Sequence, residues 1–242
     1  DTSKRFGGLA RWAFGGMALV DTPLQRTMGI SDSPERALRD WIRFGELDAS
    51  DKHSVDWAKY YVENSRSEVH DWLKGEGIKF MPAVNWVERG VNGDGNSVPR
   101  YHVVWGTSLE LTKTMIAALH KANTDNRLNL FHQHSVVELN NRNTESTLAV
   151  KGAVAKNDEE IHFKANDVVI ATGGLNGSHK GVRKNWPKDR VMPEAMLNGA
   201  HPFADGNMHH EAVDKLGGHI VNPGEMWNYA AGINHPQAEF KG

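Results

Sequence analysis

A run of ten residues, Val168-Val-Ile-Ala-Thr-Gly-Gly-Leu-Asn-Gly177, constrains the fold more than any other part of the chain. Three β-branched aliphatic residues lead into small residues and two adjacent glycines. This pattern is typical of a parallel strand that ends beneath a nucleotide, because only glycine lets the backbone come so close to a ligand. We therefore predict a buried strand ending at Ala171, with a nucleotide beside Gly173. A glycine turn that serves packing alone is the alternative.

Two further glycine pairs lie near the start of the chain, Gly7-Gly8 and Gly15-Gly16. They place bare backbone where a broad planar ring could rest, with N–H groups free to bond a ligand or its phosphates. The alternative is a glycine-rich loop that packs on a sheet. A short helix and a loop are expected over residues 1–20.

Helix signals follow. Pro34 after Ser33 predicts a helix start. Apolar residues, aromatic ones among them, recur at helical spacing from residue 54 to 74 and predict a second helix, with its aromatic residues in the core and its stop at Gly75. Thr107-Ser-Leu-Glu110 matches a capping box and predicts a third helix. Near the other end, Asp205-Gly206 predicts the start of a helix that ends at Gly217.

Short strands are predicted between the third helix and the strand ending at Ala171. They cover residues 128–131, 135–139, 148–155 and 160–164. Polar turns separate them, so we expect a small β-meander followed by a return to the main parallel sheet.

In their order, these segments resemble the FAD-binding dehydrogenases of the fumarate reductase and succinate dehydrogenase flavoprotein superfamily, in the branch of predicted oxidoreductases near the ketosteroid dehydrogenases. The resemblance implies an α/β fold: an incomplete two-dinucleotide-binding, Rossmann-like FAD domain with a β-meander over residues 1–178, then the start of an α+β capping domain over 179–242. No G-x-G-x-x-G turn occurs in the sequence. We therefore expect an internal fragment that lacks the N-terminal unit of the FAD domain, is inactive alone and does not retain FAD.

The resemblance also implies which residues contact FAD. The family's pyrophosphate-to-isoalloxazine contacts fall on Gly8, Leu9, Ala10, Gly15, Gly16 and Met17. Val136 corresponds to the residue that bonds the adenine edge, and Ala171, Thr172 and Gly173 to the strand end beside the adenosine half. Asp205 corresponds to the acid of the family's G-D-G segment, which here reads Ala-Asp-Gly. Asp205 could equally be a helix N-cap.

Tyr229 is the candidate catalytic residue, because the ketosteroid dehydrogenases use tyrosine-based acid chemistry. A packed aromatic side chain is the alternative. Fumarate reductases place a histidine followed by proline in this region, whereas here Gly232 stands at that position and His235-Pro236 is displaced. We therefore expect an FAD-dependent oxidoreductase acting on a hydrophobic ketone or enone, steroid-like substrates included. The alternatives are a non-catalytic module without cofactor, dicarboxylate reduction of the fumarate reductase type, and a nicotinamide or sugar-nucleotide enzyme.

The composition of the chain limits which classes of partner are expected. The formal net charge of −2 gives no electrostatic reason to expect nucleic acid or an anionic membrane. No apolar run approaches the length of about 20 residues that spans a bilayer. The absence of cysteine excludes disulfides and thiolate metal sites. His132 and His134 lack a third ligand, and the adjacent His209 and His210 diverge on a predicted helix, so no metal is expected. We expect the protein to lie in the cytoplasm. Its expected partners are a small hydrophobic substrate and the remainder of its own polypeptide.

Overall fold

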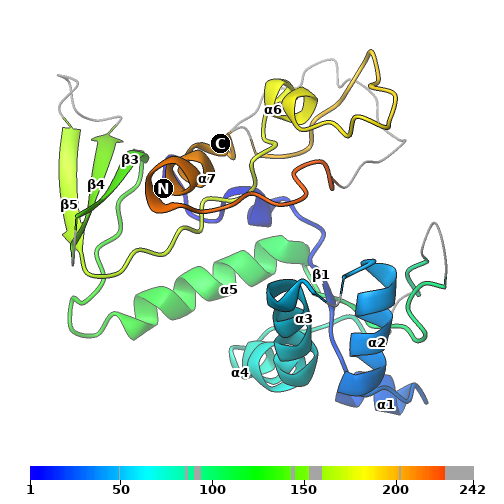
Figure 1. Cartoon of the computed structure of the whole chain (residues 1–242). Coiled ribbons are helices and arrows are strands. Elements are labelled where there is room, and N and C mark those ends of the chain that lie inside the picture. Colours follow the sequence, from blue (N-terminus) through cyan, green and yellow to red (C-terminus); the bar gives the residue numbers. More distant parts are fainter. Residues whose placement is uncertain are drawn as a thin grey trace. The chain divides into compact units, whose positions relative to one another are not determined.

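The computed structural model describes residues 1–48, 50–84, 87–89, 94–142, 145–152, 160–201 and 203–226. The chain divides into two compact units (Figure 1). The first combines Asp1–Leu9 with Leu128–Gly242, and the second is Ala10–Arg127. The expected domain boundary between residues 178 and 179 stays a prediction.

The second unit is mostly helical, with a short helix of 3-10 type, η1 (Gly8–Arg11), crossing its border. Its elements are β1 (Gly16–Ala18), α1 (Pro23–Thr27), α2 (Pro34–Phe44), α3 (Lys52–Asn64), the π-helical η2 (Ser65–Asp71), α4 (Trp72–Gly75), β2 (Tyr101–Val103) and α5 (Thr107–Ala122). β1 pairs antiparallel with β2 in a two-stranded sheet. Neither short strand was predicted, because an alternation of polar and apolar side chains cannot be recognised over only three residues.

The predicted helix boundaries near residues 34 and 75 are confirmed. Ser33 is the N-cap of α2, its hydroxyl accepts a hydrogen bond from the Arg36 N–H, and Pro34 occupies the first helical position. The predicted second helix appears as α3, η2 and α4 in succession, ending at Gly75. The capping box at Thr107 is wrong. Gly106 is the N-cap of α5, in a left-handed conformation that glycine adopts without strain, and the N-cap makes no side-chain hydrogen bond. The Thr107 hydroxyl accepts instead from the Leu109 N–H at 3.3 Å.

The core of the second unit is built from small and aliphatic side chains. One cluster joins Val20, Ala37 and Val62, and another joins Leu73, Ile78 and Val104. Aromatic residues of the long helix were expected in this core. Trp72, however, is 52% exposed, whereas the smaller Ala58 and Val62 of the same helical stripe are each 2% exposed.

The first unit holds the predicted meander. β3 (His134–Arg142), β4 (Glu145–Gly152) and β5 (Glu160–Ala165) form an antiparallel sheet in that order, with a bulge between Val136 and Glu138. The strand predicted at 128–131 is wrong, since no regular element lies there. Two helices follow, α6 (His179–Lys184) and α7 (Asn207–Leu216). The predicted end of α7 is confirmed by Gly217, which takes a left-handed conformation.

The strand predicted to end at Ala171 is wrong. Residues 167–174 have no regular secondary structure, and the Val169 side chain is 89% exposed. A strand exists only where a neighbour pairs with its backbone N–H and C=O groups, and none of the described strands pairs with this run. The sheets of the described residues are antiparallel, so the expected parallel sheet is not found in that part of the chain.

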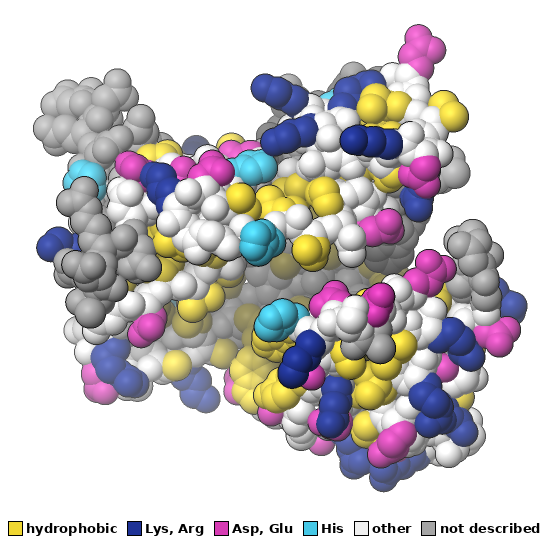
Figure 2. Space-filling model, in the orientation of Figure 1, with side chains coloured by type: hydrophobic (Ala, Val, Ile, Leu, Met, Phe, Trp, Pro, Cys, Tyr) yellow, Lys and Arg dark blue, Asp and Glu magenta, His cyan; other side chains and the backbone are white. Residues whose placement is uncertain are grey.

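Among the described residues, no helix combines the length and the apolar character needed to cross a membrane. Figure 2 shows side chains of both charges over the face it draws.

Candidate functional site

The glycine-rich segment after Ala171 packs against the turn that precedes α7. The Gly177 N–H donates to the Ala204 carbonyl at 2.8 Å. A Cβ at Gly177 would lie 2.4 Å from the carbonyl oxygens of both Ala204 and His201, and a Cβ at Gly206 would lie 2.9 Å from the Leu175 Cβ. Glycine is therefore required where these two backbones touch. The structure thus brings two sequence-predicted segments together, the Ala-Thr-Gly-Gly run and the Ala-Asp-Gly run.

The predicted contact residues of the glycine-rich run stand open to solvent. Ala171, Thr172 and Gly173 are all exposed. Gly173 has φ +82°, a conformation that favours glycine. A Cβ at Gly174 would meet no heavy atom within 4 Å. Bare backbone is therefore available here to a ligand.

Asp205 lies at the start of α7. Its Oδ1 accepts a hydrogen bond from the Asn207 N–H at 2.9 Å, and its side chain is exposed. The N-cap residue is Gly206, with φ +80°. The alternative that Asp205 is the N-cap is therefore wrong, because the N-cap is the next residue. The Asp205 carboxylate nevertheless accepts a hydrogen bond from the first N–H of the helix.

Val136 lies on β3, at the strand edge that α7 covers. Asn207 Nδ2 donates to the Val137 carbonyl at 3.3 Å, and the Leu139 N–H donates to Glu211 Oε2 at 3.0 Å. The hydrogen bond from the Leu139 N–H, together with one from Lys215, holds the pKa of Glu211 below its usual value. Side chains of α7 therefore bond backbone groups of β3 at this edge. Val136 and Asp205 belong to the same unit.

The second unit carries Gly15 at a tight junction. Gly15 has φ +86°, and its carbonyl accepts from the Val104 N–H at 2.9 Å. A Cβ at Gly15 would lie 2.7 Å from the backbone nitrogen of Ser108, at the start of α5. The turn is thus held by the segment that joins β2 to α5.

A tyrosine ring covers Gly16. A Cβ there would lie 2.0 Å from the Tyr101 ring, which stacks on Phe14 with ring centroids 6.3 Å apart. The position over Gly16 where a planar ligand was expected is therefore occupied by a side chain of the protein. Tyr101 was missed because the contact depends on the pairing of β1 with β2. The cofactor contacts assigned to these residues stay predictions.

The remaining predicted contacts differ in exposure. Gly8 has φ +44°, and a Cβ there would meet no heavy atom within 4 Å. Leu9 and Ala10, on η1, are exposed. Met17, in contrast, packs against the cluster around Val104. Tyr229, Gly232 and His235 lie outside the described residues.

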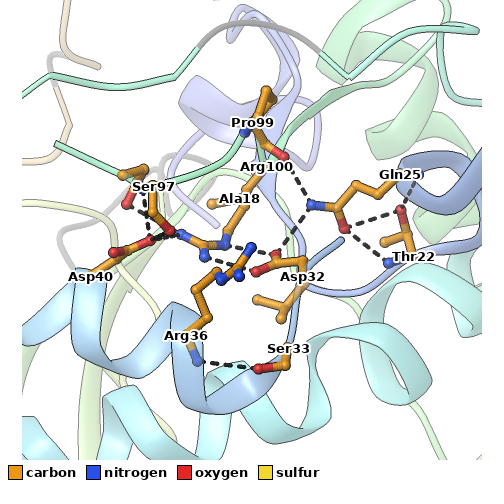
Figure 3. Close-up of polar contacts among 12 residues, drawn as sticks. Ala18, Thr22, Gln25, Asp32, Ser33, Arg36, Asp40, Ser97, Pro99 and Arg100 are labelled. Carbon is orange, nitrogen blue, oxygen red and sulfur yellow. Dashed lines mark hydrogen bonds and ion pairs between the residues drawn. The ribbon is translucent and has the colours of Figure 1, made fainter. Parts of the chain in front are cut away.

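A buried ionic cluster forms around Arg100, the residue directly before β2 (Figure 3). Arg100 donates to both oxygens of Asp32 at 2.8 Å and to Asp40 Oδ2 at 2.7 Å. All three side chains are at most 5% exposed. Burial raises the pKa of Asp40, but hydrogen bonds from Ser97 and Arg100 outweigh it and keep that pKa below its usual value. The Arg100 carbonyl also accepts from the Leu19 N–H at 3.0 Å, so the cluster anchors the residues that flank the paired strands.

His102 is a neutral imidazole in this region. Its Nδ1 lies 2.7 Å from the Arg100 carbonyl, which can only accept, so Nδ1 is the protonated nitrogen. Nε2 therefore accepts from the Thr22 hydroxyl, 2.7 Å away. Burial, with His70 nearby, lowers the pKa of His102 below its ordinary value although the bond to the carbonyl opposes this.

The chain is expected to lose stability in acid through His102. Because its pKa is lowered on folding, its contribution is complete above about pH 6.5 and falls by up to about 1.4 kcal/mol per pH unit below it. Urea unfolding between about pH 5 and pH 8 measures the free energy of unfolding across the range in which a histidine titrates. The His102→Gln variant keeps a donor and an acceptor without titrating. An acid slope as steep in that variant as in the wild type would contradict the assignment.

Known proteins resemble this chain along nearly its whole length. The family model described as FAD binding domain matches residues 1–237. A KsdD-like steroid dehydrogenase of Mycobacterium tuberculosis is 36% identical over 247 residues, covering 95% of this chain and 43% of that protein. A KsdD-like steroid dehydrogenase of Mycolicibacterium smegmatis is 34% identical over 253 residues, covering 97% and 45%. The chain thus spans less than half the length of these relatives.

Two solved structures share the fold. The open conformation of a flavocytochrome c3 fumarate reductase superposes with a TM-score of 0.65 at 21% identity, covering 88% of this chain and 35% of that one. A quinol fumarate reductase of E. coli gives 0.61 at 18% identity, covering 86% and 30%. The expected flavoprotein fold is confirmed at this level, whereas the Rossmann-like detail is not.

Proposed function

This chain belongs to the FAD binding domain family, and from that premise we propose that it is the FAD-binding core of an oxidoreductase that acts on a hydrophobic ketone or enone of the steroid type. The observation that carries the proposal is the 36% identity, across 95% of the chain, to a protein named as a KsdD-like steroid dehydrogenase. Fold alone would not choose a substrate, because one fold serves many chemistries.

The residues present suit a large cofactor that lies against backbone. Gly8 and Gly174 leave open the space that a side chain would fill, and the exposed Asp205 carboxylate offers an acceptor for hydroxyl groups. Ala171 to Gly173 would contact the adenosine half, with Val136 at the adenine edge. Residues 8–10 and 15–17 would contact the rest of the cofactor, and contact at Gly16 would require the Tyr101 ring to move away. Bound FAD supplies hydride transfer to or from the substrate.

The domain assignment follows the same proposal. Residues 1–178 would belong to the FAD-binding domain, and 179–242 would begin the capping domain that closes over the substrate. The protein around the active site would exclude water and hold the substrate ring beside the cofactor.

The proposed function is tested on the full-length protein. We expect visible absorbance of bound oxidised flavin, and turnover of a steroid ketone with an artificial electron acceptor. This chain alone is expected to retain no FAD, because it has no G-x-G-x-x-G turn for the pyrophosphate. A colourless full-length protein would contradict the proposal. Turnover of fumarate in place of the steroid would favour the dicarboxylate alternative.

Tyr229 is the proposed proton donor or acceptor. The Tyr229→Phe variant of the full-length protein is expected to lose about a hundredfold in kcat, since a positioned acid or base contributes at least that much. Its flavin content should stay unchanged. His235→Ala is the control and should turn over the steroid normally. If Tyr229→Phe retained full kcat while His235→Ala lost it, the catalytic assignment would move to the histidine.

A further inference from the structure

Positive charge gathers on α6 and the loop after it. Five Lys and Arg residues lie within residues 180–190, and the acids of the segment 179–194 are Asp189 and Glu194. Figure 2 shows dark-blue side chains around a yellow patch at the upper right, over α6 and this loop. This local positive charge is not apparent from the net charge of the whole chain, which is −2. The basic residues are all exposed: Lys180, Arg183, Lys184, Lys188 and Arg190.

The loop folds back onto α6 and carries aliphatic side chains beside the cations. Arg183 donates to the Met192 sulfur and to the Glu194 carbonyl, both at 3.1 Å. Trp186 Nε1 donates to the Arg190 carbonyl at 3.1 Å. Val191, between these anchored residues, is 93% exposed. A projecting aliphatic side chain is therefore held next to the basic side chains.

These cations repel one another, and they outnumber the two acids of the segment, Asp189 and Glu194. Lys180 and Lys184 are four residues apart and so lie on one face of α6. In the part of the chain that the structure describes, neither of them forms an ion pair, and neither does Lys188. An anionic partner would relieve this repulsion.

We propose that residues 179–197 form a docking surface for an anionic lipid bilayer. Basic side chains attract anionic headgroups, while Val191 and the 54% exposed Leu197 can enter the interface. An acidic protein would match the charge as well. Protein interfaces, however, are centred on Trp, Tyr and Arg side chains that fill pockets of the partner. Here Trp186 and Arg183 donate to the loop itself, and it is single aliphatic side chains that project outward. The proposal does not depend on the proposed oxidoreductase activity.

The test is sedimentation of the full-length protein, loaded with FAD, with lipid vesicles. Phosphatidylcholine vesicles containing phosphatidylglycerol are compared with pure phosphatidylcholine vesicles, at low and high salt. We expect binding to the anionic vesicles alone and release by salt, because the attraction is screened within a Debye length. The double variant Lys180→Glu with Lys184→Glu should weaken binding at least about tenfold. Val191→Asn should weaken it about threefold.

The matched control reverses two exposed lysines of the other unit, Lys79→Glu with Lys113→Glu. It makes the same change in net charge and should bind like the wild type. Binding that is absent, equal on neutral vesicles, or weakened as much by the control would overturn the proposal. Flavin absorbance and steroid turnover of the same samples are read separately. A failure of docking is therefore distinguishable from a failure of the proposed function.

Discussion

Replacing Arg100 by methionine is expected to destabilise the chain by about 3–5 kcal/mol. Methionine fills much of the same space but removes the buried cation that Asp32 and Asp40 share, and leaves Asp40 with the 48% exposed Arg43 at 3.1 Å. The Asp32 side chain is fully buried and that of Asp40 is 5% exposed. Neither carboxylate can recover the lost bonds from water without opening the unit. Urea or thermal unfolding of the purified variant measures the loss.

Two further variants distinguish the effect of breaking the buried cluster from the effect of removing any positive charge. Arg26→Met removes an exposed ion pair with Asp21 and should cost about 1 kcal/mol or less. Adding Asp32→Asn and Asp40→Asn to Arg100→Met removes the stranded charges and should restore part of the stability. Equal effects of Arg100→Met and Arg26→Met would show that the cluster does not carry the stability assigned to it.

Replacing Gly177 by alanine is expected to destabilise the chain by about 3 kcal/mol, at the upper end of the range for overpacking. The new Cβ would lie 2.4 Å from two backbone carbonyl oxygens, those of His201 and Ala204. Backbone yields less readily than a flexible side chain. The segment would have to move, and the bond from the Gly177 N–H to Ala204 would be lost. Thermal unfolding measures the effect.

Gly174→Ala is the matched control, three residues away. A Cβ there meets no heavy atom within 4 Å, and its φ lies outside the left-handed region. Its stability should stay within about 0.5 kcal/mol of the wild type. If FAD lies against this backbone as proposed, the same variant of the full-length protein should bind FAD more weakly. Wild-type stability in Gly177→Ala would contradict the packing argument.

The sequence predicted features that depend on neighbouring residues. Ser33 followed by Pro34 marked the start of α2, and Gly217 marked the end of α7, because caps act within one turn of helix. The β-meander was predicted from polar turns between short apolar runs. The order of the glycine-rich segments indicated the FAD binding family, which the match over residues 1–237 confirms.

Features that depend on distant partners were missed. The run at Val168–Ala171 has the composition of a buried strand, yet no described strand pairs with it. Gly16 was predicted to face a ligand, but the ring of Tyr101, brought there by strand pairing, covers it. In both cases the local pattern was read correctly as apolar or bare backbone. Gly16, however, is covered by a ring from a distant part of the sequence, whereas Val169 is 89% exposed.

By itself, the sequence determined the family, the helix ends and the segments where glycine is needed, since these follow from residue types at short spacing. The tertiary structure alone decided what those segments touch. Arg100 meets Asp32 and Asp40 across 68 and 60 residues, and Gly177 meets the carbonyl of Ala204. Such contacts depend on which distant segments the fold brings together, and composition and periodicity do not predict this. The physical reason is that burial and pairing free energies are gained only when both partners are in place.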